Sequence, residues 1–216
     1  HGNFIPQIPY QLISRYTKEG ERVFEPFMGS GTTAIECERL GREYVGFDIN
    51  PQMIEYVEQL GLCNAPIIRL ADSLDATNYE ILQEHPIHFA LLHPPYWDIV
   101  KFTHLQNDLS NCVELKEFVD KFITVCKNFM PYLPKKRYFA VVIGDVYKNS
   151  EVIPLSFYIM HHIKLNFKVK LKGIVVKNIE GNRGKLGVGG IWRYRALKSD
   201  YYIFKHEYIL VFKKEG

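Results

Sequence analysis

A glycine-rich turn between a short strand and a helix constrains this chain more than any other feature. Gly29-Ser30-Gly31-Thr32-Thr33-Ala34 follows the apolar strand expected at Arg22–Glu25 and opens a helix expected over Thr32–Leu40. It fits G-x-G-x-x-G/A, in which glycines allow a sharp turn and close ligand approach while the helix N-terminus offers free N–H groups to an anion. The turn indicates a nucleotide-type cofactor, although a dehydrogenase site and a purely structural turn both remain compatible with it.

The hydrophobic pattern around this turn alternates between strands and helices. Further strands are expected at Glu43–Asp48, Pro66–Leu70, His88–Leu92 and Tyr138–Ile143, and further helices at Tyr10–Thr17, Pro51–Leu60, Leu115–Tyr132 and Val152–Leu165. Two β-rich segments, Phe167–Lys177 and His206–Lys213, close the chain without a clear helix between them. We therefore expect an α/β fold: a mostly parallel seven-stranded sheet with helices on both faces and an antiparallel hairpin at one edge.

Length and composition fit a single globular domain over residues 1–216. About 47% of the residues are hydrophobic and 24% are charged, and no apolar run approaches the roughly 20 residues of a membrane span. No basic-then-apolar leader opens the chain at His1. The four cysteines lack C-x-x-C spacing, which argues against a metal site and a disulfide framework and favours a cytoplasmic location.

Charge is distributed unevenly along the chain. Residues 164–198 hold ten basic residues and one acid, a net charge of +9, so the rest of the chain carries −6 against a total of +3. Such asymmetry predicts one face that contacts a polyanion. The glycine-rich stretch Asn178–Tyr202 is the candidate nucleic-acid-contacting insertion, or alternatively a solvated loop. The candidate phosphate contacts are Lys177, Arg183, Lys185, Arg193 and Arg195.

Two aspartates stand at the ends of expected strands. Asp48 ends the second strand, where a carboxylate can accept both hydroxyls of an adenosine ribose. Asp72 follows the third strand, and it either accepts from an adenine amino group or caps a helix. These positions do not separate a dinucleotide from S-adenosylmethionine.

The turn after the fourth strand, His93-Pro94-Pro95-Tyr96-Trp97, is more specific. Consecutive prolines hold an extended backbone and remove two N–H donors, so the turn presents carbonyl oxygens beside an aromatic ring. That surface suits a planar group with an amino function, which would donate to the carbonyls and stack on Tyr96. A structural turn with Tyr96 and Trp97 in the core is the alternative interpretation.

These motifs together resemble the DNA amino-methyltransferases. Residues 24–33, FEPFMGSGTT, resemble the family's cofactor motif D-P-F-M-G-S-G-T-T, and HPPY at 93–96 resembles its catalytic motif [D/N/S]-P-P-[Y/F]. The opening residues 1–7 and the closing residues 207–213 also look like family segments. The resemblance implies a Rossmann-like class I methyltransferase that transfers a methyl group from S-adenosylmethionine to cytosine N4 or adenine N6 of a base flipped out of duplex DNA.

The resemblance also implies roles for individual residues. The expected cofactor-binding residues are Gln7, Glu25, Phe27, Gly29, Ser30, Gly31, Thr32, Asp48, Ile49, Asp72 and Ser73, and the expected catalytic residues are His93, Pro94, Pro95 and Tyr96. Residues 98–109 are expected to close over the flipped base. Beyond DNA, the partners that the resemblance suggests are a second copy of the chain and a cognate restriction endonuclease.

Three departures from the family pattern stand out. Glu25 replaces the usual aspartate, His93 replaces Asp, Asn or Ser, and the cofactor motif precedes the catalytic one, as in a circular permutation. We expect His93 to accept a hydrogen bond through a neutral ring nitrogen or its backbone carbonyl. If the ring accepts, activity should fall below pH about 6.5, the unperturbed imidazole value.

The identity of the substrate is left open between several candidates. Tyr96-Trp97 favours cytosine N4, because cytosine members of the family often read S-P-P-Y-W, and no cysteine follows a proline as carbon-five methylation would need. The nearest alternative is an RNA amino-methyltransferase, since some RNA enzymes have this turn with the motifs in this order. A catalytically inactive module that binds the cofactor and a nicotinamide-dependent dehydrogenase are more distant alternatives.

Overall fold

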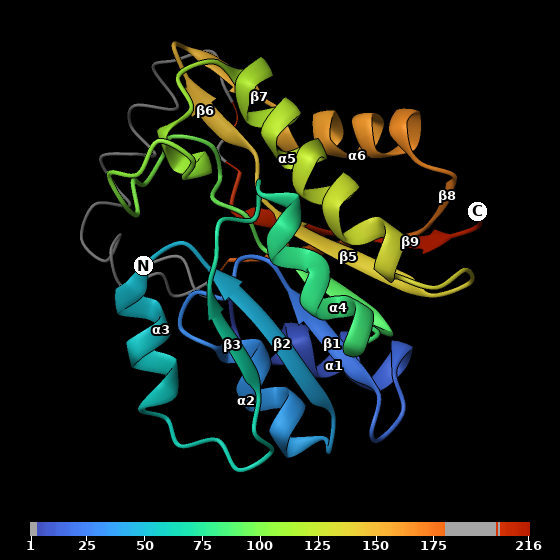
Figure 1. Ribbon diagram of the computed structural model, residues 1–216. Coiled ribbons are helices and arrows are strands. Elements are labelled where there is room, and N and C mark those ends of the chain that lie inside the picture. Colours follow the sequence, from blue (N-terminus) through green and yellow to red (C-terminus); the bar gives the residue numbers. More distant parts are fainter. Residues whose placement is uncertain (1–3, 180–201, 203) are drawn as a thin grey trace.

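The expected seven-stranded sheet forms the centre of the computed structural model, which describes residues 4–179, 202 and 204–216 (Figure 1). Within these residues the strands are β1 (Arg22–Glu25), β2 (Glu43–Asp48), β3 (Ile67–Leu70), β4 (Phe89–Leu92), β5 (Tyr138–Ile143), β8 (Val169–Asn178) and β9 (His206–Lys214). Their order is β3-β2-β1-β4-β5-β9-β8. The first five strands pair in parallel, and β9 is antiparallel to both β5 and β8, which confirms the expected edge hairpin.

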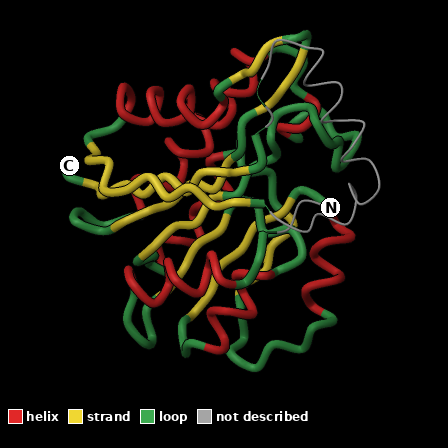
Figure 2. The backbone as a smooth tube through the Cα atoms, turned by 180° about the vertical axis from the view of Figure 1, so that it is seen from behind, coloured by secondary structure: helices red, strands yellow, loops and turns green. Residues whose placement is uncertain are grey.

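Helices cover both faces of this sheet (Figures 1 and 2). The described helices are α1 (Gln7–Tyr16), α2 (Thr32–Arg39), α3 (Pro51–Glu58), α4 (Ile81–Glu84), α5 (Leu115–Phe129) and α6 (Leu155–Asn166). Side chains alternate across the strands: Phe139 and Val141 of β5 pack into the core under α5 and α6, whereas Ala140 packs into the core under α1 and α2. This two-faced burial explains why the parallel strands read as continuous apolar runs.

Three details differ from the sequence-based expectation. Val152 does not begin a helix: it lies in a short hairpin of β6 (Val146–Lys148) and β7 (Glu151–Ile153), and α6 begins at Leu155 after Pro154. Asn149 and Ser150 make the hairpin turn with φ angles of 51° and 62°, as a two-residue turn of the hairpin type requires. In addition, α1 begins at Gln7 rather than Tyr10, and residues 76–84 form short helical turns that the pattern did not predict.

In the part of the chain that the structure describes, no helix combines the length and the apolar character that a bilayer crossing needs.

Candidate functional site

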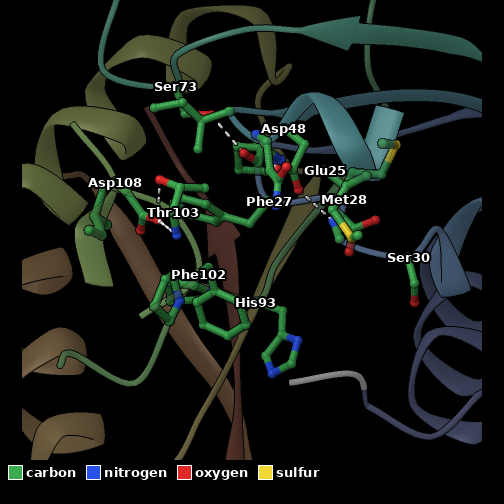
Figure 3. A pocket seen from close by; sticks show the side chains of 18 of the residues that line it. Glu25, Phe27, Met28, Ser30, Asp48, Ser73, His93, Phe102, Thr103 and Asp108 are labelled. Atoms are coloured by element: carbon green, nitrogen blue, oxygen red, sulfur yellow. Dashed lines mark hydrogen bonds between the residues drawn. The ribbon is translucent and has the colours of Figure 1, made fainter. Parts of the chain in front are cut away.

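A cavity of about 630 Å³ opens at the carboxyl ends of the parallel strands (Figure 3). Strands β1 and β4 lie side by side at the centre, and the chain runs outward from them in opposite directions, to β2 on one side and to β5 on the other. Ligands of open α/β sheets bind at such a switch point. Of the residues expected at the site, the cavity is lined by Glu25, Phe27, Gly29, Ser30, Thr32, Asp48, Ile49, Asp72, Ser73, His93, Pro94, Pro95 and Tyr96.

The glycine loop is held against the end of β2. The backbone N–H of Gly29 donates to Oδ2 of Asp48 at 2.7 Å, and the backbone N–H of Met28 donates to the carbonyl of Phe47 at 2.8 Å. Gly31 stands at the N-cap of α2 with a φ of 77°, a left-handed conformation that favours glycine. The loop therefore turns directly into α2 and presents the free N–H groups of this helix at the cavity.

Asp48 joins the glycine loop to the start of α3 through its two carboxylate oxygens. Its Oδ1 accepts from the backbone N–H of Asn50 at 2.8 Å, while Oδ2 accepts from Gly29. Burial raises the pKa of the Asp48 carboxyl, and these backbone N–H donors oppose the shift. A carboxylate has about four lone-pair sites, so the side chain retains acceptor capacity on the cavity side for ribose hydroxyls.

Glu25 lies deep in the wall of the cavity. It is 1% exposed, and it accepts from Thr33 Oγ1 at 2.9 Å and from Tyr44 Oη at 2.6 Å. Burial raises the pKa of the Glu25 carboxyl to about 8 despite these two hydrogen bonds, and the charge of Asp48 adds to the shift. Glu25 is therefore an uncharged acid near neutral pH, and it braces the start of α2 against β2.

Asp72 does not cap a helix, because Asp75 is the N-cap of the short helical turn that follows, Ala76–Glu80. Asp72 Oδ1 accepts from the backbone N–H of Leu74 at 2.8 Å within a turn, and Oδ2 accepts from Asn107 Nδ2. The residue also lines the cavity. A carboxylate oxygen has two lone-pair sites, so Oδ2 keeps one acceptor site beside the bond from Asn107. The contact of Asp72 with an adenine amino group stays a prediction. Nearby, Ser73 Oγ donates to the carbonyl of Pro26 at 2.6 Å and ties the end of β3 to the end of β1.

His93 begins the turn after β4 and is partly buried in the cavity wall. Its ring packs on Phe4, with 4.7 Å between ring centroids, and Nε2 lies 3.3 Å from Tyr96 Oη. Burial lowers the pKa of His93 to about 4, because the lowering effects of burial and Lys177 outweigh the raising effect of Glu207. The ring is therefore neutral at physiological pH. The loss of activity expected below pH about 6.5 is now expected only near pH 4.

Tyr96 is held from two directions. Its hydroxyl donates to Glu207 Oε2 at 2.7 Å, and its ring lies so close to Gly144 that a Cβ there would stand 2.8 Å from Tyr96 Cε2. Trp97 turns the other way: it is 7% exposed and donates through Nε1 to the carbonyl of Cys112 at 3.0 Å. Trp97 thus belongs to the core, whereas Tyr96 faces the cavity.

The segment after the turn forms one wall of the cavity. Asp108 organises it by accepting from the backbone N–H and the hydroxyl of Thr103 through one oxygen and from the backbone N–H of Ser110 through the other. The lining residues from this segment are Ile99, Val100, Phe102, Thr103, Asn107, Asp108 and Leu109, of which Figure 3 labels three. This segment therefore borders the cavity, and its closing over a base stays a prediction.

Some expected site residues lie elsewhere. Gln7 is exposed on α1 and does not line the cavity, and Gly31 contributes through the backbone turn alone. Lys177, expected to contact phosphate, instead pairs with Glu207 at 2.9 Å. The other four expected phosphate contacts lie outside the described residues: Arg183, Lys185, Arg193 and Arg195.

The residues that line the cavity but were not named individually from the sequence include Phe4, Phe102, Asn107 and Glu207. Each lies in a segment that the sequence analysis singled out: Phe4 in the opening residues 1–7, Phe102 and Asn107 in residues 98–109, and Glu207 in the closing residues 207–213. Which side chains of these segments reach the cavity depends on the tertiary structure.

Known proteins resemble this chain in two ways. A family model described as DNA methylase, for N6 and N4 enzymes, matches residues 4–59. The Type II methyltransferase M.MjaII of Methanocaldococcus jannaschii is 42% identical over 50 residues, 23% of this chain and 9% of the relative. The Type II methyltransferase M.XycI of Xanthomonas campestris pv. cyanopsidis is 35% identical over 69 residues, 32% of this chain and 23% of the relative. The matched stretch therefore spans less than a quarter of the length of these curated relatives.

Solved structures resemble the fold of almost the whole chain. An rRNA methylase from Streptococcus thermophilus superposes with a TM-score of 0.58 at 12% identity and covers 99% of this chain and 98% of its own. A putative methyltransferase from Streptococcus mutans, solved in complex with SAH, has a TM-score of 0.54 at 13% identity and covers 98% of this chain and 99% of its own. At such identities the likeness extends to the fold alone. Residues 4–59 thus resemble a segment of the N6/N4 DNA methylase family, and the chain has the Rossmann-like fold of solved methyltransferases.

Proposed function

We propose that the protein transfers a methyl group from S-adenosylmethionine to the exocyclic amino group of a base flipped out of duplex DNA, with cytosine N4 favoured over adenine N6. One observation supports this most: the glycine loop with Asp48 and the turn from His93 to Tyr96 line the same cavity. Methyl transfer needs a cofactor and an amine in one cleft at close range. The family match of residues 4–59 adds support for the cofactor half of the site.

The cofactor half has the donors and acceptors that an adenosyl amino acid requires. Asp48 supplies a partly buried carboxylate for ribose hydroxyls, and the glycine loop and the N-terminus of α2 supply backbone N–H groups for a carboxylate. Ser73 and Asp72 close the adenine end. S-adenosylmethionine, when bound, supplies an electrophilic methyl group on a sulfonium.

The base half is built to accept hydrogen bonds from an amine. Pro94 and Pro95 line the cavity and have no N–H of their own, so an amino group that donates to their carbonyl oxygens would meet no competing donor from these two residues. The ring of Tyr96 supplies a stacking surface at a fixed angle, held by Glu207 and Gly144. Hydrogen bonds from the amine to the Pro94 carbonyl and to His93 would localise the nitrogen lone pair, which conjugation otherwise draws into the base. Most of the rate enhancement then comes from positioning and preorganised acceptors.

The point at which the basic stretch begins supports a nucleic-acid partner. Strand β8 runs parallel in space to β5, so its end at Asn178 lies at the same edge of the sheet as the cavity, and Ile179 lines the cavity. The stretch 178–202, which holds the expected phosphate contacts Arg183 to Arg195, therefore starts at the cavity. Phosphate contacts of such residues would set the register of the duplex without reading its sequence.

Methyl transfer to different nucleic acids tests this proposal. The protein is incubated with S-adenosylmethionine labelled at the methyl group and with either unmethylated duplex DNA or a structured RNA. We expect label in the DNA, with a loss of about tenfold to a hundredfold in the Tyr96→Ala variant, which removes the stacking surface for the base. Label in RNA alone would contradict this proposal and indicate an RNA methyltransferase. Binding of the cofactor without transfer to either nucleic acid would indicate a catalytically inactive module.

A further inference from the structure

A chain of hydrogen bonds links His93 to a carboxylate on the last strand. Glu207 lies at the start of β9, 111 positions along the sequence from Tyr96, and it is only 6% exposed. Its Oε2 accepts from the Tyr96 hydroxyl at 2.7 Å, and its Oε1 accepts from Lys177 Nζ at 2.9 Å. The pairing of Glu207 with Lys177 across the β8–β9 ladder holds the carboxylate in place.

The protons in this chain can be counted. The Tyr96 hydroxyl has one proton, and it is donated to Glu207. Towards His93 the same oxygen can then only accept, so the proton of the 3.3 Å contact belongs to His93 Nε2. A neutral imidazole has one N–H, and Nδ1 is consequently the nitrogen with the free lone pair.

The electrostatics of the site agree with this assignment. Burial and the neighbouring Glu207 raise the pKa of Tyr96 well above its usual value, so the phenol keeps its proton. Burial lowers the pKa of His93 to about 4, so the ring stays neutral. The groups that face the ring are Tyr96, Glu207 and Lys177, with Phe4 packed on it.

Among the described residues, the hydrogen-bond contact of the His93 ring is the one between Nε2 and Tyr96, so Nδ1 has no donor there. His93 and Tyr96 both line the cavity. A ring nitrogen with a lone pair can replace the carboxylate or amide oxygen that the related catalytic motif supplies at this position.

We propose that Glu207 is a positioning residue that fixes the tautomer of His93: through Tyr96 it keeps the proton on Nε2 and leaves Nδ1 as the acceptor for the amino group of the target base. This role rests on the proposed amino-methyl transfer. The opposite tautomer would turn an N–H towards the N–H of the amine, two donors facing each other, and the base would lose one of its two acceptors.

The charge of Glu207 matters as well as its shape. A carboxylate can only accept, so Tyr96 must donate to it. In a Glu207→Gln variant the amide NH2 can donate to the Tyr96 oxygen, and the phenol can then rotate its proton towards His93 Nε2. That reversal would move the ring proton to Nδ1, with hardly any change in side-chain volume.

Nitrogen NMR of the protein labelled with ¹⁵N-histidine reads the tautomer directly, without cofactor or nucleic acid. The His93 signals are identified by their loss in His93→Ser. At pH 7 we expect a protonated Nε2 and an unprotonated Nδ1 in the native protein, and a mixture or the opposite tautomer in Glu207→Gln. Tyr96→Phe keeps the Glu207–Lys177 pair but removes the hydroxyl, so it should also abolish the preference for the Nε2-protonated tautomer. This variant provides the test if Glu207→Gln does not fold.

Glu215→Gln is the matched control, because Glu215 pairs with Lys170 at 2.9 Å next to the same β8–β9 hairpin but away from the cavity. It should leave the His93 signals unchanged. A protonated Nδ1 in the native protein, or the native tautomer retained in both Glu207→Gln and Tyr96→Phe, would overturn the proposal.

Kinetics connect the tautomer to the reaction. For Glu207→Gln we expect kcat to fall about tenfold or more, the usual cost of one hydrogen bond to a reacting group, with unchanged cofactor affinity and partial recovery in Glu207→Asp. A changed tautomer with an unchanged kcat would contradict the positioning role. If no nucleic acid is methylated by the native protein, the proposed function fails, and that result is distinct from a wrong tautomer in the NMR spectrum.

Discussion

At the scale of single residues, the polar side chains of the cleft are engaged by partners from distant parts of the chain. Asp48 holds the backbone of Gly29, and Tyr96 donates to Glu207 on the last strand. Local motifs predicted the residue types at 29–32, 48 and 93–96, because each stands at the end of a strand. They could not predict Glu207 as a partner, since the pairing of β5 with β9 brings it there.

The pH dependence of methyl transfer tests the environment of His93. Because burial lowers the pKa of His93 to about 4, the ring stays an acceptor down to that pH. In a pH profile of kcat/KM, we expect no loss around pH 6.5 and a fall with a midpoint near pH 4 that is absent in His93→Ser. A midpoint near 6.5 in the native protein would mean that the ring is solvated as in an ordinary exposed histidine.

Glu25 should make the protein less stable as the pH rises. Its pKa of about 8 in the folded protein lies above the ordinary value of 4.5, so between these limits the folded state binds more protons than the unfolded state. The free energy of unfolding then decreases by up to about 1.4 kcal/mol per pH unit from this group. Urea unfolding between pH 5 and 8 should show this slope reduced in Glu25→Gln.

The comparison of the two slopes isolates Glu25, because the other titrating groups are shared. Thr33 and Tyr44 can reorient their hydroxyls to satisfy the amide of the variant, so the absolute stability is less informative than the slope. Parallel pH curves for the two proteins would show that Glu25 titrates normally.

At the scale of elements, segments with a clear hydrophobic period and a capping residue were predicted well. Helix α3 is an example, with Asn50 as a cap that accepts from Gln52 and Pro51 at the first position. The β6–β7 hairpin was missed because its turn, Asn149-Ser150, contains no glycine and its apolar residues also fit the helix that follows. The faces that the helices cover depend on the handedness of the crossovers.

The turn into α2 can be tested with a pair of glycines. Gly31 and Gly20 both have a φ of 77°, but a Cβ on Gly31 would lie 2.8 Å from Val57 Cγ2, whereas a Cβ on Gly20 would have no neighbour within 4 Å. Gly20→Ala should therefore cost about 1 kcal/mol of unfolding free energy from backbone strain alone. Gly31→Ala should cost about 1–3 kcal/mol more and weaken cofactor binding.

Thermal unfolding and calorimetric titration with S-adenosylmethionine give the two readouts for this pair. Equal losses of stability in both variants, with native cofactor affinity in Gly31→Ala, would show that the turn at Gly31 is not part of the cofactor site.

At the scale of the whole molecule, the sheet brings the cofactor turn and the proline turn into one cleft, as the parallel order of β1 and β4 requires. The sequence predicted this meeting because both turns follow parallel strands, whose carboxyl ends share one edge. The conformation of the cavity wall after the proline turn could not be predicted from the sequence, because it depends on the hydrogen bonds that Asp108 accepts. The segment with the expected phosphate contacts begins at that same edge, after Ile179.

The salt dependence of DNA binding tests the basic segment. Removing two phosphate contacts should reduce the slope of log K against log salt by about 1.8, or about 0.9 for each. We expect this for Arg193→Gln/Arg195→Gln. Lys164→Gln/Lys168→Gln removes the same charge at exposed positions in α6 and just before β8, at the opposite edge of the sheet. An equal change in both double variants would indicate a general charge effect.

The atom that receives the methyl group tests the central claim most directly. Duplex DNA treated with the protein and S-adenosylmethionine is digested to nucleosides, and the modified nucleoside is identified by mass spectrometry against standards. An acceptor-lined turn beside the cofactor loop predicts methyl on an exocyclic nitrogen, as N4-methylcytosine in preference to N6-methyladenine. Methyl on carbon five of cytosine or on the sugar, or DNA without any modification while the protein binds the cofactor, would contradict it.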